Sequence, residues 1–499
     1  MADVLANGLA FWPVGVPLAA AALTILLHGA PRLQRGVMEA GVLVMLVAAV
    51  ALLRAVIQHD VVATDFGGWR APFGVGFHAD RLSAALATVT GIVALAVAIY
   101  ARAEVGARRR RVGFDPLFLA MLAAVNGAFL TGDVFNLYVW FELMLVTALG
   151  LMTLDRRRTQ IDGAIRYASM SMMGATFILL GVGLLYGEAG TLNMVDLAEK
   201  LAGRAPSVTL VASAFLLLAG FALKTGLFPL FFWLPASYHT APIVAVAALA
   251  GLLTKVGFYA CLRVFVLVFG VAGGSVVPGL PAVFGVLAAA TMLVSVLAAI
   301  AQVDIRRLLG YHIVAQVAYP MVGLALASFV GIAAAIFYMV HTMLVQTGLF
   351  LGAGAIARAN GSYDMRRCGG LMVYQPFFAG LFALLAFSMI GVPPLSGFWA
   401  KYFVIDAAFR GGAVWLAVVS LVVGFLTLHS LSKLWSHAFW KAPPRERRVL
   451  RRIPPAMTLA LMLLCACTLG IGLAVEPVSE FVREAARQMT SAATTGGLP

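Results

Sequence analysis

The pattern of hydrophobic and polar positions along the chain is that of repeated membrane spans. Apolar runs of about twenty residues recur along most of the sequence, each bounded by charged residues or by Gly and Pro clusters. A helix of about this length crosses the hydrocarbon core of a bilayer. We predict an all-α, polytopic membrane protein with about fourteen transmembrane helices, at residues 9–28, 37–57, 82–102, 115–130, 134–154, 163–186, 208–234, 242–268, 279–302, 307–327, 330–357, 372–409, 412–438 and 455–475.

The seventh and twelfth spans are predicted to be broken helices. Pro229 and Pro235 lie at the end of the seventh span, and the segment Gly391–Gly397, with two prolines, lies inside the twelfth. Proline has no amide donor and clashes with the preceding turn, so a helix kinks or ends there. Backbone groups freed in this way persist in a membrane only against protein or water, and such breaks are typical of ion pathways.

Two segments between the spans have a different character. The stretch from Val61 to Asp80 is polar and Gly-rich, and it is predicted to be an extracellular hairpin or loop. The stretch from Thr191 to Leu201 has charged residues on one side, which suits a helix lying at the membrane interface.

A repeated signature divides the chain into two halves. The motif Gly-Phe-x-x-Lys ends at Lys224 and, 177 residues later, at Lys401, and Lys255 is followed 178 residues later by Lys433. We therefore predict two halves built to one plan, each with lysines in its middle. The predicted regions are an N-terminal three-helix region (1–113), a first repeat of spans 4–8 (114–268), a second repeat of spans 9–13 (279–438), and a cytoplasmic loop, span 14 and outer tail (439–499).

The composition excludes a soluble protein. The 499 residues are 62% hydrophobic and 11% charged, with a mean hydropathy of +0.98, whereas a soluble domain has roughly 45–50% apolar and about 25% charged residues. The net charge of +14 comes largely from Lys and Arg in the loops. That distribution is typical of membrane proteins, so we expect a lipid bilayer and no nucleic acid as a partner.

The basic loops also predict the orientation of the chain. Basic residues gather in the loops after odd-numbered spans, among them Arg108 to Arg111, Arg156 to Arg158 and Lys441 to Arg452. Loops rich in Lys and Arg stay in the cytoplasm. We therefore expect a multi-pass protein of the bacterial inner (plasma) membrane with both termini outside.

Few ionisable side chains lie inside the predicted spans, which makes each of them a candidate functional residue. A charge at the bilayer centre costs roughly 2.5–3.5 kcal/mol on insertion scales. Glu142 lies about a third of the way into span five, and Lys224 lies within span seven. A carboxylate close to a buried lysine changes that lysine's affinity for a proton, so the pair predicts a proton switch. A structural ion pair between two helices, or a Lys224 side chain that reaches the interface, is the alternative.

Lys255, His341 and Lys401 extend this candidate proton relay. Lys255 lies some thirteen residues into span eight, too deep for its side chain to reach the interface comfortably. Lys401 follows the Pro-Pro break of span twelve and repeats the Gly-Phe-x-x-Lys motif. His341 in span eleven is a group that titrates near neutral pH and can bridge the two halves. A buried histidine bonded only to a neighbour is the alternative for His341.

Three further residues are possible relay or entry groups. His239 follows the Trp-Leu-Pro turn, at the expected mouth of the path. His312 and Lys433 stand closer to the cytoplasmic ends of their spans, so a relay role and an ordinary interface role are both open. Asp133 and Asp304 lie near span ends and are predicted to be surface or capping groups.

Motifs for other chemistry are absent from the sequence. It has no P-loop, no G-x-G-x-x-G between a strand and a helix, and no Cys/His spacing for a metal. The four cysteines include no C-x-x-C pair and are interpreted as small hydrophobic residues. We expect no cofactor, no bound metal ion and no catalytic residues.

Five motifs together resemble the antiporter-like subunits shared by respiratory complex I and the multi-subunit Mrp cation/proton antiporters, and most closely the D subunits of the latter. They are Phe141-Glu142-Leu143, Lys224-x-x-x-x-Pro229-x-x-x-Trp233-Leu234-Pro235, Leu253-Thr254-Lys255, Arg307-Leu308-Leu309-Gly310-Tyr311 and Gly391-Val392-Pro393-Pro394-x-x-Gly397-Phe398-x-x-Lys401. The resemblance extends over residues 114–437.

The resemblance implies an arrangement of helices and a set of site residues. It implies inverted five-helix repeats at spans 4–8 and 9–13, and a chain of protonatable groups formed by Glu142, Lys224, Lys255 and Lys401. One departure concerns the breaks: Pro393-Pro394 has no counterpart at Leu216-Leu217, so the two breaks need not be alike.

The leading hypothesis is a proton-translocating membrane subunit of a multi-subunit monovalent cation (Na+)/proton antiporter, which works with other membrane subunits and is not itself an enzyme. A proton-pumping subunit of a complex I-like quinone oxidoreductase or a membrane hydrogenase is the first alternative. A subunit of an inorganic-carbon accumulation complex is the second.

Overall fold

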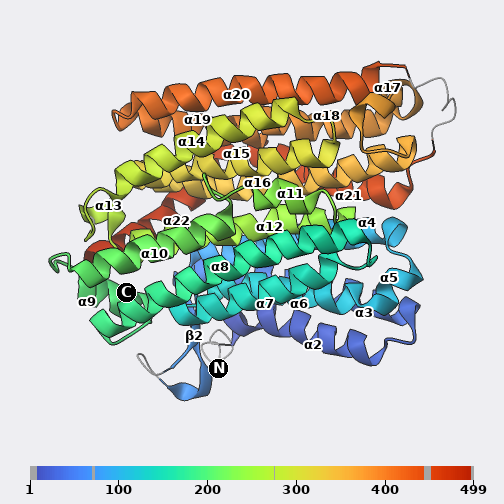
Figure 1. The fold of residues 1–499 in the computed structure, drawn as a ribbon. Coiled ribbons are helices and arrows are strands. Elements are labelled where there is room, and N and C mark those ends of the chain that lie inside the picture. Colours follow the sequence, from blue (N-terminus) through green and yellow to red (C-terminus); the bar gives the residue numbers. More distant parts are fainter. Residues whose placement is uncertain (1–7, 70–73, 275, 443–450, 496–499) are drawn as a thin grey trace.

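The computed structural model describes residues 8–69, 74–274, 276–442 and 451–495. Most of them are helical, which confirms the predicted fold class (Figure 1). The helices lie side by side with their long axes roughly aligned. Arg445, Arg447 and Arg448 of the predicted basic loop lie outside the described residues.

Among the described residues, twelve helices are long and apolar enough to cross a membrane. They are η1 and α2 (Leu9–Leu26), α3 (Pro31–His59), α4 (Arg81–Glu104), α7 (Val134–Met152), α8 (Arg158–Ala189), α10 (Val208–Thr225), α12 and η3 (Ile243–Val268), α14 (Leu280–Ala301), α15 (Ile305–Ala325), α16 (Phe329–Asn360), α20 and η5 (Val414–Trp440) and α21 (Pro455–Leu473). Two apolar helices are shorter, α6 (Phe114–Leu130) and α18 (Pro376–Ile390). These fourteen segments overlap the fourteen predicted spans; the number of spans that cross the membrane stays a prediction.

The remaining elements connect or cover these helices. They are β1 (Val62–Asp65), η2 (Phe66–Gly68), β2 (Gly76–Ala79), α5 (Ala107–Val112), α9 (Met194–Leu201), α11 (Trp233–Tyr238), α13 (Val271–Gly274), η4 (Met365–Arg367), α17 (Leu371–Tyr374), α19 (Ser396–Arg410) and α22 (Val475–Thr495). The strands β1 and β2 pair antiparallel, so the segment predicted as a hairpin or loop is a hairpin. Figure 1 places this hairpin, α9 and α13 at one end of the bundle, the hairpin end, and α5 and α17 at the other, the basic end.

Both predicted interruptions are present, and they differ from each other. The helix α10 ends at Thr225, one residue after Lys224, and the chain resumes a helix only at α11. The helix α18 ends at Ile390, and Lys401 lies in the second half-helix, α19. The two motif lysines therefore stand on opposite sides of their breaks. The sequence departure at Pro393-Pro394 correctly indicated that the breaks are not alike.

The first three helices of each predicted half correspond closely. The 32-residue helices α8 and α16 start and end with an offset of 171 residues (Arg158 to Phe329, Ala189 to Asn360). Two short antiparallel bridges have the same offset, Asp133 with Asn193 and Asp304 with Asp364. These equal offsets favour the predicted repeat, whose inverted orientation in the membrane stays a prediction.

Asp133 and Asp304 are capping groups, as predicted. The Asp133 side chain accepts a hydrogen bond from the Asn136 amide at the start of α7. The Asp304 side chain accepts from the Arg306 and Arg307 amides at the start of α15. Each carboxylate satisfies amides that the first turn of a helix leaves free.

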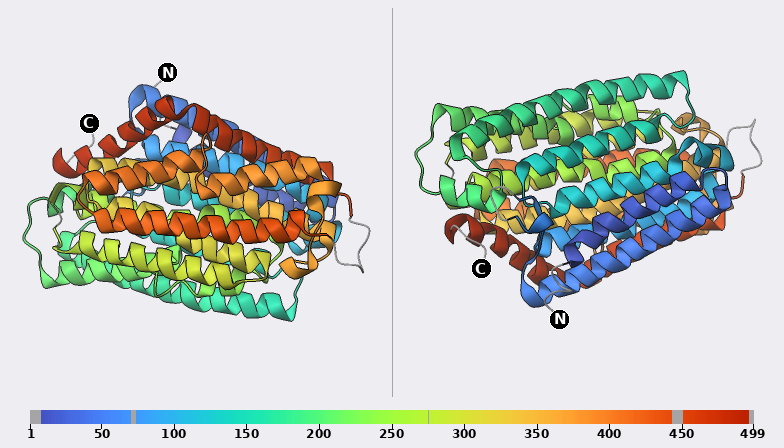
Figure 2. Two further views of the ribbon diagram at one scale, coloured as in Figure 1. Left: turned by 90° about the horizontal axis from the view of Figure 1, so that it is seen from above. Right: turned by 90° about the horizontal axis from the view of Figure 1, so that it is seen from below.

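The core of the bundle is formed by α12 and α16, which Figures 1 and 2 show surrounded by the other helices. Every residue of α12 is buried, and so is most of α16. A helix that is apolar on all sides is expected in such a position. Both helices carry candidate relay residues, Lys255 on α12 and His341 on α16.

The helix α22 is an element that the sequence pattern did not lead us to predict. It contacts α16, α4 and η3 beside the last membrane helix, α21 (Figure 2). Its apolar residues recur every three or four positions, and Val482, Ala485, Ala486 and Met489 are buried. This spacing gives one apolar stripe, which is the signal of an amphipathic helix.

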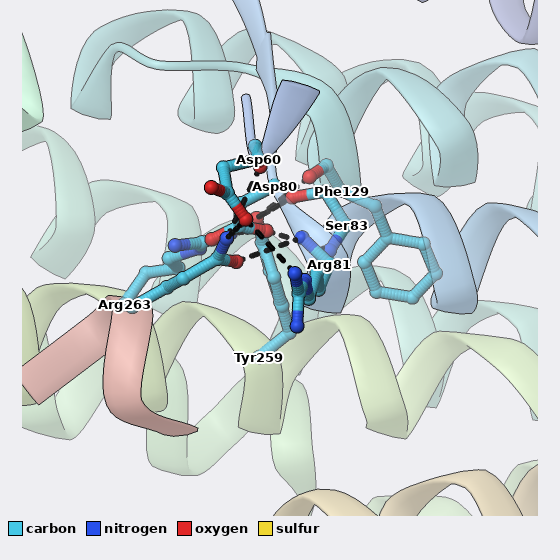
Figure 3. A network of polar contacts seen from close by, with 8 residues as sticks. Asp60, Asp80, Arg81, Ser83, Phe129, Tyr259 and Arg263 are labelled. Atoms are coloured by element: carbon cyan, nitrogen blue, oxygen red, sulfur yellow. Dashed lines mark hydrogen bonds and ion pairs between the residues drawn. The ribbon is translucent and has the colours of Figure 1, made fainter. Parts of the chain in front are cut away.

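A buried polar network fixes the hairpin end (Figure 3). Asp80 caps α4 by accepting from the Ser83 amide at 2.8 Å, and Arg263 Nη2 donates to Asp80 Oδ1 at 2.6 Å. Arg263 Nε donates to the Tyr259 hydroxyl, which itself donates to the Phe129 carbonyl at 2.6 Å. The network thus joins α4, α6, α12 and η3, and it pairs two charges that are both largely buried.

We predict that Asp80→Asn and Arg263→Gln each destabilise the protein by about 3–5 kcal/mol, because each leaves one buried charge without its partner. Thermal unfolding of the purified protein in detergent measures the effect. Asp162→Asn is the matched control: it removes an ion pair with Arg166 in which both side chains are more than half exposed, so a change below about 1 kcal/mol is expected. Equal unfolding temperatures for all three variants would contradict the prediction.

Candidate functional site

The predicted partners Glu142 and Lys224 lie together. Lys224, in the last turn of α10, places its Nζ 2.8 Å from the Ser171 hydroxyl on α8 and 4.0 Å from Glu142 Oε1 on α7. The ammonium also lies over the Phe141 ring, 5.5 Å from its centroid. The Lys224 side chain is only 7% exposed, so it does not reach an interface. The pair is at the edge of ion-pair distance, which leaves room for the two groups to approach or separate.

Lys255 is fully enclosed by α12 and α16. Its Nζ donates to the Ala250 carbonyl at 2.6 Å and to the Gln346 side-chain oxygen. The side chain is 1% exposed, which excludes a position at the interface, as predicted. Gln346 Nε2 is buried and has no hydrogen-bond partner among the described residues. A buried amide donor in this state is suited to bind water.

Lys401 is held by the break in span twelve. Its Nζ donates to the Ile390 carbonyl at 2.8 Å. In an uninterrupted helix this carbonyl would accept from the amide four residues later, but that residue is Pro394, which has no amide hydrogen. The ammonium also lies 5.3 Å from the centroid of the Tyr319 ring. The break therefore creates the acceptor that the buried lysine needs.

His341 contacts the same break from α16. Its Nδ1 lies 2.8 Å from the Ser396 hydroxyl at the start of α19. The approach is close because residue 397 is glycine: a Cβ there would lie 1.6 Å from the Ser388 carbonyl oxygen and 2.8 Å from the His341 ring. His341 is thus bonded to a neighbour in the second predicted repeat, and its role as a bridge between the repeats stays a prediction.

The three possible entry residues have different surroundings. His312 is fully buried, with Nε2 2.9 Å from the Ser430 hydroxyl and Nδ1 without a partner among the described residues. It is not an interface residue. Lys433 donates to the carbonyls of Ile300 and Gln302 at 2.8 and 2.9 Å, at the end of α14. These carbonyls have no partner within their helix, so Lys433 caps it.

His239 lies beside α15, at the end of α11. Arg307 Nη2 is 3.1 Å from His239 Nε2, and Nδ1 is 2.9 Å from the Pro235 carbonyl. These partners assign a neutral ring that accepts from Arg307 and donates to Pro235. Burial lowers the pKa of His239 below its usual value, which favours the same neutral state.

Several uncharged polar residues of the site were missed by sequence reasoning. The Tyr338 hydroxyl donates to Gln316 Oε1 at 2.5 Å, and the Tyr338 and Tyr319 rings stack at 4.9 Å. Tyr338 also contacts the His341 ring edge to face at 5.7 Å. The signal available in the sequence was a Gln or Tyr inside an apolar run, which is weaker than a charge because such residues are also common as packing groups.

The arrangement can hold and pass protons. Each of the three buried ammonium groups donates to a neutral oxygen, and among the described residues only Lys224 has a carboxylate within ion-pair distance. Between Lys255 and Lys401 lie the amides of Gln346 and Gln316, whose Nε2 atoms have no partner within the described structure. Such a series of donors and acceptors is suited to proton transfer through bound water.

The chain is similar to known transport and respiratory proteins. The D subunit of the Na(+)/H(+) antiporter of Alkalihalophilus pseudofirmus is 36% identical over 483 residues, covering 97% of each chain. A chain of the Mrp complex from a Dietzia species matches with a TM-score of 0.91 and 30% identity, covering 99% of each chain. A chain of respiratory complex I from Thermus thermophilus matches with a TM-score of 0.83 at 22% identity, over 98% of this chain and 100% of that one, and shares the fold alone.

A family model described as NADH:quinone oxidoreductase/Mrp antiporter, transmembrane, matches residues 131–427. This stretch includes Glu142, Lys224, Lys255, His341 and Lys401. Because the match covers more than half of the chain, and the antiporter relative aligns along nearly its whole length, the protein belongs to the transmembrane family of NADH:quinone oxidoreductase and Mrp antiporter subunits.

Proposed function

We propose that this chain is the proton-translocating membrane subunit of a multi-subunit Na+/H+ antiporter. The relative named as the D subunit of an antiporter and the Mrp complex chain support this proposal, since both align over almost the whole sequence. Other membrane subunits are its partners, and Na+ is the cation exchanged for protons. The membrane is the bacterial plasma membrane, with the basic end in the cytoplasm and both termini outside.

The observation that carries the proposal is the buried contact between Glu142 and Lys224. A charged group in a bilayer is costly and persists where it serves ion movement or is firmly paired. Here the pairing is loose, because 4.0 Å separates the two charged atoms and Glu142 Oε1 has no hydrogen-bond partner among the described residues. A firm structural lock would show a short hydrogen bond, as the Asp80–Arg263 pair does at 2.6 Å.

The proposed route runs from Glu142 and Lys224 through Lys255 to His341 and Lys401. A proton that leaves Lys224 weakens the attraction on Glu142, and a proton that arrives restores it. The neutral amide and phenol groups between Lys255 and Lys401 carry the proton onward with bound water. Inward proton flow along this route drives cation export by the partner subunits.

Lys224→Ala is expected to reduce Na+-dependent proton flux to the background level, because the variant lacks the group that accepts the proton next to Glu142. The flux is measured as ΔpH in everted membrane vesicles that contain the chain with its native partner subunits. Lys200→Ala is the matched control, since Lys200 is exposed on α9 and pairs with Asp196 at 3.1 Å. Wild-type flux in Lys224→Ala, at a normal level of assembled protein, would disprove the proposed role.

The identity of the co-purifying partners tests the wider proposal. Small hydrophobic membrane subunits are expected to accompany the chain. Flavin-bearing or iron–sulfur partners would instead make it a proton-pumping subunit of a redox complex and overturn the antiporter assignment. In that case Lys224→Ala is still expected to stop proton transfer.

Lys433→Met is predicted to act on stability rather than on transport. The substitution leaves the Ile300 and Gln302 carbonyls at the end of α14 without their donor, and each unsatisfied buried acceptor costs about 1–3 kcal/mol. The unfolding temperature is expected to fall, while the proton flux per assembled protein stays within about twofold of the wild type, a difference of only about 0.4 kcal/mol. Lys401→Met is the comparison: it is expected to lose the flux. Loss of flux in both variants would place Lys433 in the relay.

A further inference from the structure

The helix α22 borders a groove that the proposed proton route does not use. The groove has a volume of about 420 Å³ and lies between the first turns of α16, the end of α19 and α22. On α16 its wall is apolar, with Val330, Ala333 and Phe337. Val330 is 47% exposed although it lies in a membrane helix. The groove therefore opens to the surroundings of the protein at its apolar wall.

A second cavity continues the groove toward the interior. It has a volume of about 150 Å³, lies between α3, α4, α16, α21 and α22, and shares Phe337 and Val482 with the groove. Thr88 is the one polar side chain on its described wall, and its hydroxyl already donates to the Ala84 and Ala49 carbonyls. A buried water needs two to four polar partners. This cavity is therefore suited to hydrocarbon.

The groove itself has a charged mouth. Arg410 and Arg483 line it together with Asp406 and Ser479. Arg410 pairs with Asp406 at 2.9 Å, and within the described part of the chain Arg483 has no acidic group at ion-pair distance. Two guanidinium groups and one carboxylate leave a net positive charge beside a hydroxyl donor. A guanidinium fork matches the geometry of phosphate oxygens.

We propose that this groove binds one anionic phospholipid of the leaflet at the hairpin end. Its phosphate contacts Arg410 and Arg483, and one acyl chain follows the apolar wall past Phe337 into the inner cavity. The proposal rests on the sequence of surfaces along one path: cationic at the mouth, apolar on the wall and dry at the end. A bound lipid would tie α22 to α16 and α19. The inference does not depend on the proposed transport function.

The test measures lipid binding to the purified full-length protein by native mass spectrometry and by the shift in its unfolding temperature. Phosphatidylglycerol is expected to bind and to raise the unfolding temperature, and phosphatidylcholine, which has no net charge, to bind more weakly. The double variant Arg410→Gln/Arg483→Gln is expected to bind phosphatidylglycerol about tenfold more weakly or worse, because charge-assisted hydrogen bonds to the phosphate are lost.

Arg487→Gln is the matched control. Arg487 lies on the same helix, one turn after Arg483, pairs with Glu484 and is not on the wall of the groove. It is expected to bind phosphatidylglycerol like the wild type. A second variant, Ala333→Phe, fills the groove from α16 without changing its charge and is expected to reduce binding of both lipids. The double arginine variant changes only exposed side chains, so its folding is retained.

Three results would overturn the proposal. The first is equal phosphatidylglycerol binding by the wild type and the double arginine variant. The second is displacement of the lipid by millimolar inorganic phosphate, which would make this a phosphate site. The third is a photo-crosslinker at position 479 that captures a partner subunit instead of lipid in the assembled complex, which would make the groove a protein interface.

Discussion

A buried ammonium group needs an oxygen atom, and this requirement shapes the helices of the protein. In a regular helix every interior carbonyl is already used, so acceptors are free only at helix ends or on polar side chains. Lys401 uses the Ile390 carbonyl, which Pro394 leaves without a donor. Lys433 uses the carbonyls at the end of α14. The helix breaks and the buried lysines are therefore parts of one arrangement.

The two central helices meet the same requirement differently. α12 and α16 are long and uninterrupted around Lys255, so its acceptors are a main-chain carbonyl and the Gln346 side chain across the helix contact. That contact is close. A Cβ at Gly251 would lie 2.0 Å from the Thr347 hydroxyl oxygen, and small residues are what allow membrane helices to approach in this way. The glycine and the glutamine together fix the position of Lys255 between the two halves of the chain.

Charge pairs at the two ends of the bundle hold the N-terminal helices against this core. At the hairpin end the Asp80–Arg263 pair joins α4 to η3. At the basic end Arg110 pairs with Asp115 in an equally buried position between α5 and α6. Both are short and firmly bonded, unlike the 4.0 Å contact between Glu142 and Lys224. The difference in geometry separates charges that hold the fold from charges that are suited to move a proton.

The sequence by itself determined the features that depend on local chemistry. Long apolar runs indicated the helices, prolines indicated the breaks, and charges inside apolar runs indicated Glu142 and the lysines, because each signal is strong within a short window. Tertiary structure alone decided which groups meet. Gln346, Ser171 and Ser396 are ordinary polar residues until the packing of distant helices places them against Lys255, Lys224 and His341. The capping role of Lys433 and the groove beside α22 likewise arise from segments far apart in the chain, and such contacts leave no pattern in either segment alone.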